Sequence, residues 1–76
     1  MNAADRITRN PAVMGGKPCI RNLRVTVGMI AGLVAMGKTW ENILKLYPYL
    51  ESEDITAALT YAARRAEEQE VELQRG

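Results

Sequence analysis

One short segment, residues 15–27, constrains the fold of this chain more than any other. It reads GGKPCIRNLRVTV, with two glycines, a proline and two short runs typical of strands. Pro18 has no N–H to donate to a strand ladder, so its strand begins there or lies at a sheet edge. Asn22 tolerates the left-handed backbone conformation that tight turns need. We therefore expect a hairpin that turns at Asn22, between residues 18–20 and residues 23–25. A further short strand is expected at residues 6–8.

Three helices are expected after this hairpin, over residues 27–36, over residues 40–47, and from residue 51 or 52 onward. The first two each have a threonine N-cap and a residue that ends the helix, namely Thr26 with Gly37 and Thr39 with Pro48. Apolar residues recur at helical spacing in the second and third helices. Those expected in the core are Trp40, Tyr47, Ile55, Leu59, Ala62 and Ala66.

The predicted fold is therefore mainly α, with a short N-terminal β-hairpin followed by a three-helix, helix-turn-helix bundle. Residues 1–63 form this domain, and residues 64–76 form an acidic helical extension. A chain of 76 residues buries only about 60% of the surface that it exposes when unfolded, so its own core is small. Cys19 is the only cysteine, so no disulfide adds stability.

Oligomerisation is the remaining way to stabilise so small a chain, and we expect a homodimer. The apolar side chains of the hairpin and the first helix are the candidates for its interface. They are Ile7, Ile20, Val25, Val27, Ile30 and Val34.

Charge is distributed unevenly along the chain. Residues 1–50 carry seven Lys or Arg against two Asp or Glu, and residues 51–76 carry three against seven. Two surfaces of opposite sign suggest two kinds of partner, whereas the simpler reading is an uneven solvated surface. Both readings stay open from the sequence.

Several function classes find no support in the sequence. No apolar run approaches the roughly 20 residues of a membrane span, and no signal-peptide pattern begins the chain, so we expect a cytoplasmic protein with no membrane role. The chain has no His and no pairing of a nucleophile with a base, so we expect no enzyme, no metal, no cofactor and no small-molecule substrate. Gly15-Gly16-Lys17 lacks the spacing of a phosphate loop.

An ordered series of short motifs resembles a known prokaryotic family. The motifs are GKPCIR at 16–21, RVTV at 24–27, GKTWENIL at 37–44, YP at 47–48, EDI at 53–55 and AAL at 57–59. Together they resemble domain-of-unknown-function family 433 over residues 6–63. The resemblance implies a homeodomain-like three-helix fold preceded by short strands. Some members resemble VapB-type antitoxins, which are encoded beside PIN-like ribonuclease toxins.

The sequence departs from the family pattern at two places. Asn22-Leu23 replace a usual Gly-Thr, and Leu23 removes a hydroxyl group there. Glu51-Ser52 replace a usual Thr-Pro at the start of the last helix, and Glu is the weaker N-cap.

Two sets of residues are candidates for binding. The cations Lys17, Arg21, Arg24 and Lys38 are candidates for binding operator DNA. The alternative for the hairpin cations is that they are solvated side chains on a hairpin that serves dimer assembly. Major-groove reading by the helix-turn-helix is disfavoured, because the carboxylates of Glu51, Glu53 and Asp54 at the start of its second helix would repel phosphates. The acidic extension is the candidate for binding a PIN-like toxin, through Arg64, Glu68, Val71 and Leu73.

The sequence thus predicts an antitoxin of a type II toxin–antitoxin pair, which neutralises a PIN-like toxin and contributes to regulation of its own operon by binding DNA. Two alternatives stay open. One is a stand-alone DNA-binding regulator, and the other is a structural dimerisation module that binds no DNA.

Overall fold

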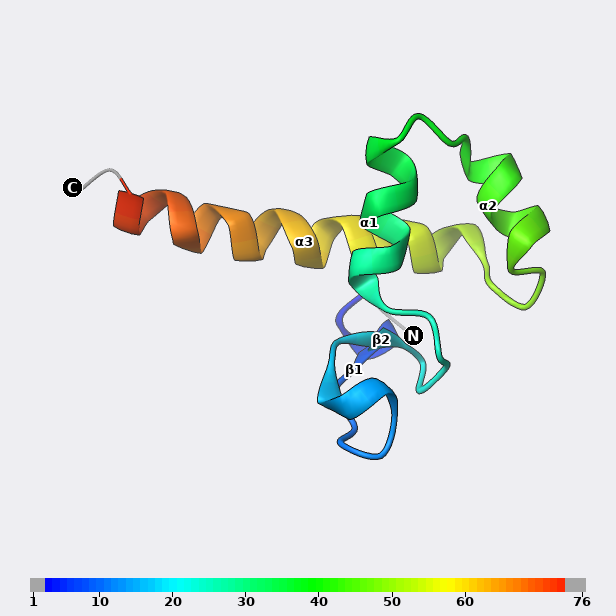
Figure 1. Ribbon diagram of the computed structural model, residues 1–76, viewed down its shortest axis with the longest axis horizontal. Helices are drawn as coiled ribbons and strands as arrows, with labels where there is room; N and C mark the ends of the chain where they lie inside the picture. The colour runs from blue at the N-terminus through cyan, green and yellow to red at the C-terminus, as the bar shows by residue number, and fades with distance from the viewer. Residues whose placement is uncertain (1–2, 74–76) are drawn as a thin grey trace.

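A small β region lies beside a three-helix body, and the last helix runs well past that body (Figure 1). The computed structural model describes residues 3–73, with side chains described through residue 68. The elements in chain order are η1 (Ala4–Arg6), β1 (Ile7–Thr8), η2 (Met14–Gly16), β2 (Cys19–Ile20), α1 (Val27–Ala35), α2 (Trp40–Leu46) and α3 (Ser52–Leu73). The predicted fold class, mainly α with an N-terminal hairpin and three helices, is confirmed.

Strand β2 is hydrogen-bonded on both of its edges. On one side it pairs antiparallel with β1, with Ile7 opposite Ile20. On the other side the chain turns back at residues 20–23, and the Ile20 N–H donates to the Val25 carbonyl over 2.9 Å. The expected turn at Asn22 is confirmed, with a φ of 60°. The expected strand at residues 23–25 is wrong, because only an isolated bridge between Cys19 and Thr26 forms there.

The two threonine caps begin their helices as expected. Thr26 Oγ1 accepts from the Met29 N–H over 3.0 Å, and Thr39 Oγ1 accepts from the Asn42 N–H over 3.1 Å. Gly37 has a φ of 88° and follows the last residues of α1. Its left-handed conformation lets the Lys38 N–H reach back to the Leu33 carbonyl over 3.0 Å, which closes the helix in a Schellman motif.

The apolar core of the three-helix body is built from residues of one copy of the chain. Its buried members come from β2, the turn after it, all three helices and the loop before α3, and they are Ile20, Val25, Val27, Ile30, Ile43, Leu50, Ile55 and Ala58. Four of the six residues expected at a dimer interface are among them, each no more than 4% exposed: Ile20, Val25, Val27 and Ile30. That expectation is corrected, because these side chains present no surface to a second copy. Ile7 and Val34 are half-buried and pack against the same core.

The expected place of Trp40 in the core is also wrong. Its side chain is 40% exposed at the first position of α2, whereas Ile43, one turn later, is fully buried. Tyr47 is half-buried against the core, as expected. A helix as short as α2 has room for one buried stripe, and Ile43 occupies it.

Helix α3 has a packed half and a free half. Ile55, Ala57 and Ala58 are buried, and Leu59 and Ala62 pack against the core. Every residue from 63 to 68 is exposed, so the expected place of Ala66 in the core is wrong. The helix continues unbroken to Leu73. The extension predicted from residue 64 is therefore a continuation of α3, which sets the 43 Å length of the molecule (Figure 1).

Replacing Ile30 tests the placement of the core. Ile30→Ala should lower the free energy of unfolding by about 2–5 kcal/mol, because it opens a cavity among fully buried neighbours. Urea denaturation followed by circular dichroism measures this loss. Met36→Ala is the control, since Met36 is 74% exposed. Its effect should stay within about 0.5 kcal/mol, and equal losses in both variants would contradict the assignment.

Candidate functional site

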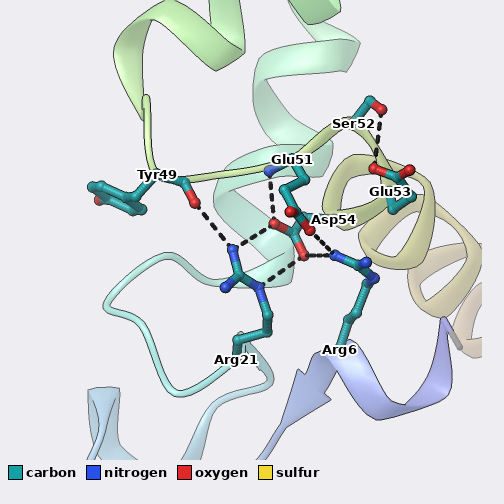
Figure 2. A network of polar contacts seen from close by, with 7 residues as sticks. All are labelled: Arg6, Arg21, Tyr49, Glu51, Ser52, Glu53 and Asp54. Atoms are coloured by element: carbon teal, nitrogen blue, oxygen red, sulfur yellow. Dashed lines mark hydrogen bonds and ion pairs between the residues drawn. The ribbon is translucent and has the colours of Figure 1, made fainter. Parts of the chain in front are cut away.

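Asp54 lies at the centre of the densest polar network among the described residues (Figure 2). Its carboxylate lies in the first turn of α3 and is completely buried. Oδ1 accepts from Arg6 Nη1 over 2.8 Å and from Arg21 Nε over 3.1 Å, and Oδ2 accepts from Arg21 Nη2 over 2.9 Å. Two arginines that lie 15 positions apart in the sequence thus meet at one carboxylate.

The backbone also contributes to this network. The Glu51 N–H donates to Asp54 Oδ2 over 2.8 Å. This is half of a capping box, in which the third residue of a helix accepts from the residue before the helix. Glu51 is a poor N-cap itself, so the carboxylate of Asp54 satisfies a donor at a helix start that would otherwise have no partner.

Arg21 reaches Asp54 from a strained backbone position. Its φ is 44°, in the left-handed region that costs a non-glycine residue roughly 1–2 kcal/mol. Its N–H donates to the Arg6 carbonyl over 2.8 Å, and its Nη2 donates to the Tyr49 carbonyl over 3.0 Å. These contacts hold the turn in the conformation that directs the guanidinium at Asp54 (Figure 2).

Arg6 also bonds to a second carboxylate. Its Nη1 lies 2.7 Å from Glu51 Oε1 as well as 2.8 Å from Asp54 Oδ1. The side chain of Glu51 is 59% exposed, so its ion pair contributes little to stability, whereas Asp54 is shielded from water. The contacts to buried Asp54 therefore contribute more to the stability of the fold than the contact to exposed Glu51 does.

The hydrogen bonds keep Asp54 ionised despite its burial. Burial by itself raises the pKa of this carboxyl group, but the hydrogen bonds from Arg21, from the Glu51 N–H and from Arg6 outweigh it and leave the pKa below its ordinary value. Hydrogen bonds to Glu51 and then to Asp54 raise the pKa of Arg6, and the hydrogen bonds to Asp54 raise the pKa of Arg21. Both oxygens of Asp54 are occupied by donors from its own chain, so the arrangement acts as a clasp between the hairpin and α3.

The structure separates the cations expected at DNA. Lys17, Arg24 and Lys38 are exposed. Arg21 is half-buried with three of its hydrogen bonds directed to Asp54 and Tyr49, so its expected role as a free cation for phosphate is corrected. Lys38 shares a shallow hollow with Lys45, which the sequence analysis did not single out.

The acidic start of α3 also needs correction. Of the carboxylates at residues 51, 53 and 54, only Glu51 and Glu53 are exposed. Asp54 is neutralised by arginines, and Glu51 is paired with Arg6. The electrostatic argument against phosphates near this helix start is therefore weaker than the sequence suggested.

The residues expected to bind a toxin lie along the free half of α3. Arg64 and Glu68 are exposed there. Val71 and Leu73 belong to the same helix, and their side chains lie outside the described part of the chain.

Sequence reasoning missed Arg6 and the role of Asp54. One signal was available: an Asp at the third position of a helix that follows a weak N-cap indicates a capping interaction. Nothing in the spacing of Arg6, Arg21 and Asp54 indicates that they meet, because their contact depends on how the hairpin lies against α3.

Comparison with known proteins assigns the chain to a family. A family described as "Protein of unknown function (DUF433)" matches residues 7–62. The chain belongs to the DUF433 family. The match covers both strands, Arg21 and Asp54 of the clasp, and all three helices up to the end of the packed half of α3, whereas Arg6 lies one residue before it. The expected family is thereby confirmed.

A curated relative extends the same finding. The chain is 38% identical over 60 residues to "Uncharacterized protein y4eO" of Sinorhizobium fredii, an alignment that covers 79% of the chain. The chain spans only 27% of the length of that relative. No solved structure matches the chain significantly.

The described residues contain neither a membrane-spanning helix nor a metal-binding cluster. No helix there is long and apolar enough to cross a membrane. No group of three His, Cys, Asp or Glu side chains within residues 3–68 is placed to hold a metal ion.

Replacing Asp54 tests the clasp. Asp54→Asn should lower the free energy of unfolding at pH 7 by about 3 kcal/mol, because it leaves two arginines facing a neutral group. Because the pKa of Asp54 is lower in the folded chain, its stabilisation is complete above the ordinary value of 3.8 and is lost as pH falls through the folded value. Denaturation from pH 7 to pH 2 should therefore show a shallower acid loss in Asp54→Asn.

The exposed neighbour Glu53 provides the matched control. Glu53→Gln removes a carboxylate from the same helical turn and should leave the unfolding free energy within about 0.5 kcal/mol of the unmodified chain. Equal losses in the two variants would show that helix-terminal charge, rather than the buried clasp, is responsible.

Proposed function

We propose that this chain is a non-catalytic antitoxin that binds a PIN-like ribonuclease toxin through the free half of α3. One observation carries the proposal: residues 63–68 are all exposed on a helix whose preceding residues form the core. A helix that leaves its own body in this way offers a rigid face to another protein. The resemblance of some family members to VapB-type antitoxins supplies the class of partner.

The sequence of the free half supports a partner with a basic surface. Residues 67–72 carry four glutamates, Glu67, Glu68, Glu70 and Glu72, with Val71 between them. We call residues 67–72 the acidic segment. A carboxylate-rich helix suits a basic groove of the kind that handles RNA phosphates, and occupying such a groove would block a ribonuclease.

Truncating the free half tests this proposal. Deleting residues 64–76 should weaken binding of a PIN-like toxin by at least about tenfold, because the binding helix is lost. Replacing the four glutamates of the acidic segment with glutamine should weaken binding while keeping the helix. Glu41→Gln on α2 is the control and should bind normally. Binding of the truncated chain at unchanged affinity would sink the proposal.

The exposed cations favour a second function, binding of operator DNA. Lys17, Arg24 and Lys38 are exposed in the basic first part of the chain, and the side chains of Lys17 and Arg24 have no ion-pair partner among the described residues. Cations in this state can neutralise phosphates on binding. The exposed and hollow-lining Lys45 adds a fourth positive charge beside Lys38. This function is compatible with the antitoxin proposal.

Salt dependence tests the second function. Lys17→Ala combined with Arg24→Ala should reduce the slope of log binding constant against log salt by about 1.8, since each lost phosphate contact removes about 0.9. Fluorescence anisotropy on promoter DNA measures the slope. Lys17→Arg combined with Arg24→Lys is the control, because it keeps both charges and should leave the slope unchanged. An unchanged slope in the first variant would contradict DNA contacts by these residues.

A further inference from the structure

A groove lies where α3 leaves the body of the molecule. It has a volume of about 370 Å³ and runs between the start of α1, the segment before β2 and the middle of α3. Its lining combines an apolar part with two arginines and includes no carboxylate. The residues that matter here are Arg9, Val27, Tyr61, Ala62, Arg65 and Ala66. We call it the Arg9–Arg65 groove.

Neither arginine of the groove has a strong ion-pair partner among the described residues. Arg9 is exposed and has no ion-pair partner among the described residues. Arg65 lies 3.8 Å from Glu68 with both side chains more than half exposed, a surface pair of little energetic value. A carboxylate-bearing helix with some apolar surface would complement this groove in both charge and character.

The chain itself carries such a segment on the same helix. The acidic segment begins two residues after Arg65 on α3. It cannot enter the groove of its own chain, because α3 is one continuous helix that carries the segment away from the body (Figure 1). The acidic segment of a second copy is free of this restriction and can reach the groove.

We propose that two copies of this chain pair antiparallel through the free halves of α3, with the acidic segment of each lying along the Arg9–Arg65 groove of the other. The antiparallel arrangement follows from the charges. Positive residues 64–65 precede the negative acidic segment on each helix, so antiparallel copies match opposite signs while parallel copies match like signs. A two-fold axis fills both grooves at once and closes the assembly at a dimer.

The contact surface of α3 suits a close approach of two helices. Ala62 and Ala66 lie one turn apart on the groove side and have no bulky side chain to hold a second helix away. Four of the six side chains expected at an interface of the hairpin and α1 are buried in the core, so this surface of α3 is the better candidate for the further stabilisation that so small a core needs.

The dimer does not depend on the proposed binding of a toxin. A toxin that takes the acidic segment would displace the second copy, but the dimer forms from this chain alone. Measurements on the purified chain therefore distinguish failure of the dimer from failure of the antitoxin proposal.

Charge reversal with complementation tests the dimer. The groove variant combines Arg9→Glu and Arg65→Glu, and the arm variant combines Glu70→Lys and Glu72→Lys. Sedimentation equilibrium of each full-length variant should show a dimer dissociation constant raised at least about tenfold, since like charges then face each other. An equimolar mixture of the two variants should regain a dimer, because opposite charges again face each other at both grooves.

The controls and contrary outcomes are equally definite. Glu41→Lys combined with Lys45→Glu changes charges on exposed positions of α2 and should leave the dissociation constant unchanged. Circular dichroism verifies folding, and the arm variant lies outside the packed core, so it still reports if the groove variant unfolds. A monomeric unmodified chain, variants that dimerise normally, or a mixture that stays monomeric would each overturn the proposal.

Discussion

The buried carboxylate of Asp54 is the contact on which the rest of the structure depends. It joins the N-terminal segment through Arg6, the tight turn through Arg21 and the start of α3 through the Glu51 N–H. A buried ion pair of this kind contributes little net stability compared with apolar packing, but an unmatched partner is costly. The clasp therefore ties the hairpin to the start of α3, and an arrangement that separated its members would leave a buried charge unmatched.

That placement has consequences for both proposed functions. It takes Arg21 out of the set of free cations and leaves Lys17, Arg24 and Lys38 at the surface. It also ends the packed body near Ala62, so α3 continues as an exposed helix with cations followed by carboxylates. The charge asymmetry of the sequence thus becomes a separation in space, with the exposed charges of residues 64–68 lying beyond the packed start of α3.

Local signals in the sequence were reliable where the relevant contacts are local. The threonine caps, the closing glycine of α1 and the left-handed Asn22 each act within a few residues, and each was found where expected. Burial was less predictable. Trp40 was expected inside and is exposed, and Ile30 was expected at an interface and lies in the core, because helical periodicity shows that a face is apolar without showing what covers it.

The sequence by itself determined the mainly helical class, the order of the elements, the family and the opposite charges of the two parts of the chain. Only the tertiary structure decided which charges are available. Asp54 appeared as one of several acidic residues in a first turn, and Arg21 as one of several basic residues in a hairpin. Their meeting depends on contacts across 33 positions of the sequence, and such contacts are set by how the hairpin packs against α3 rather than by any local pattern.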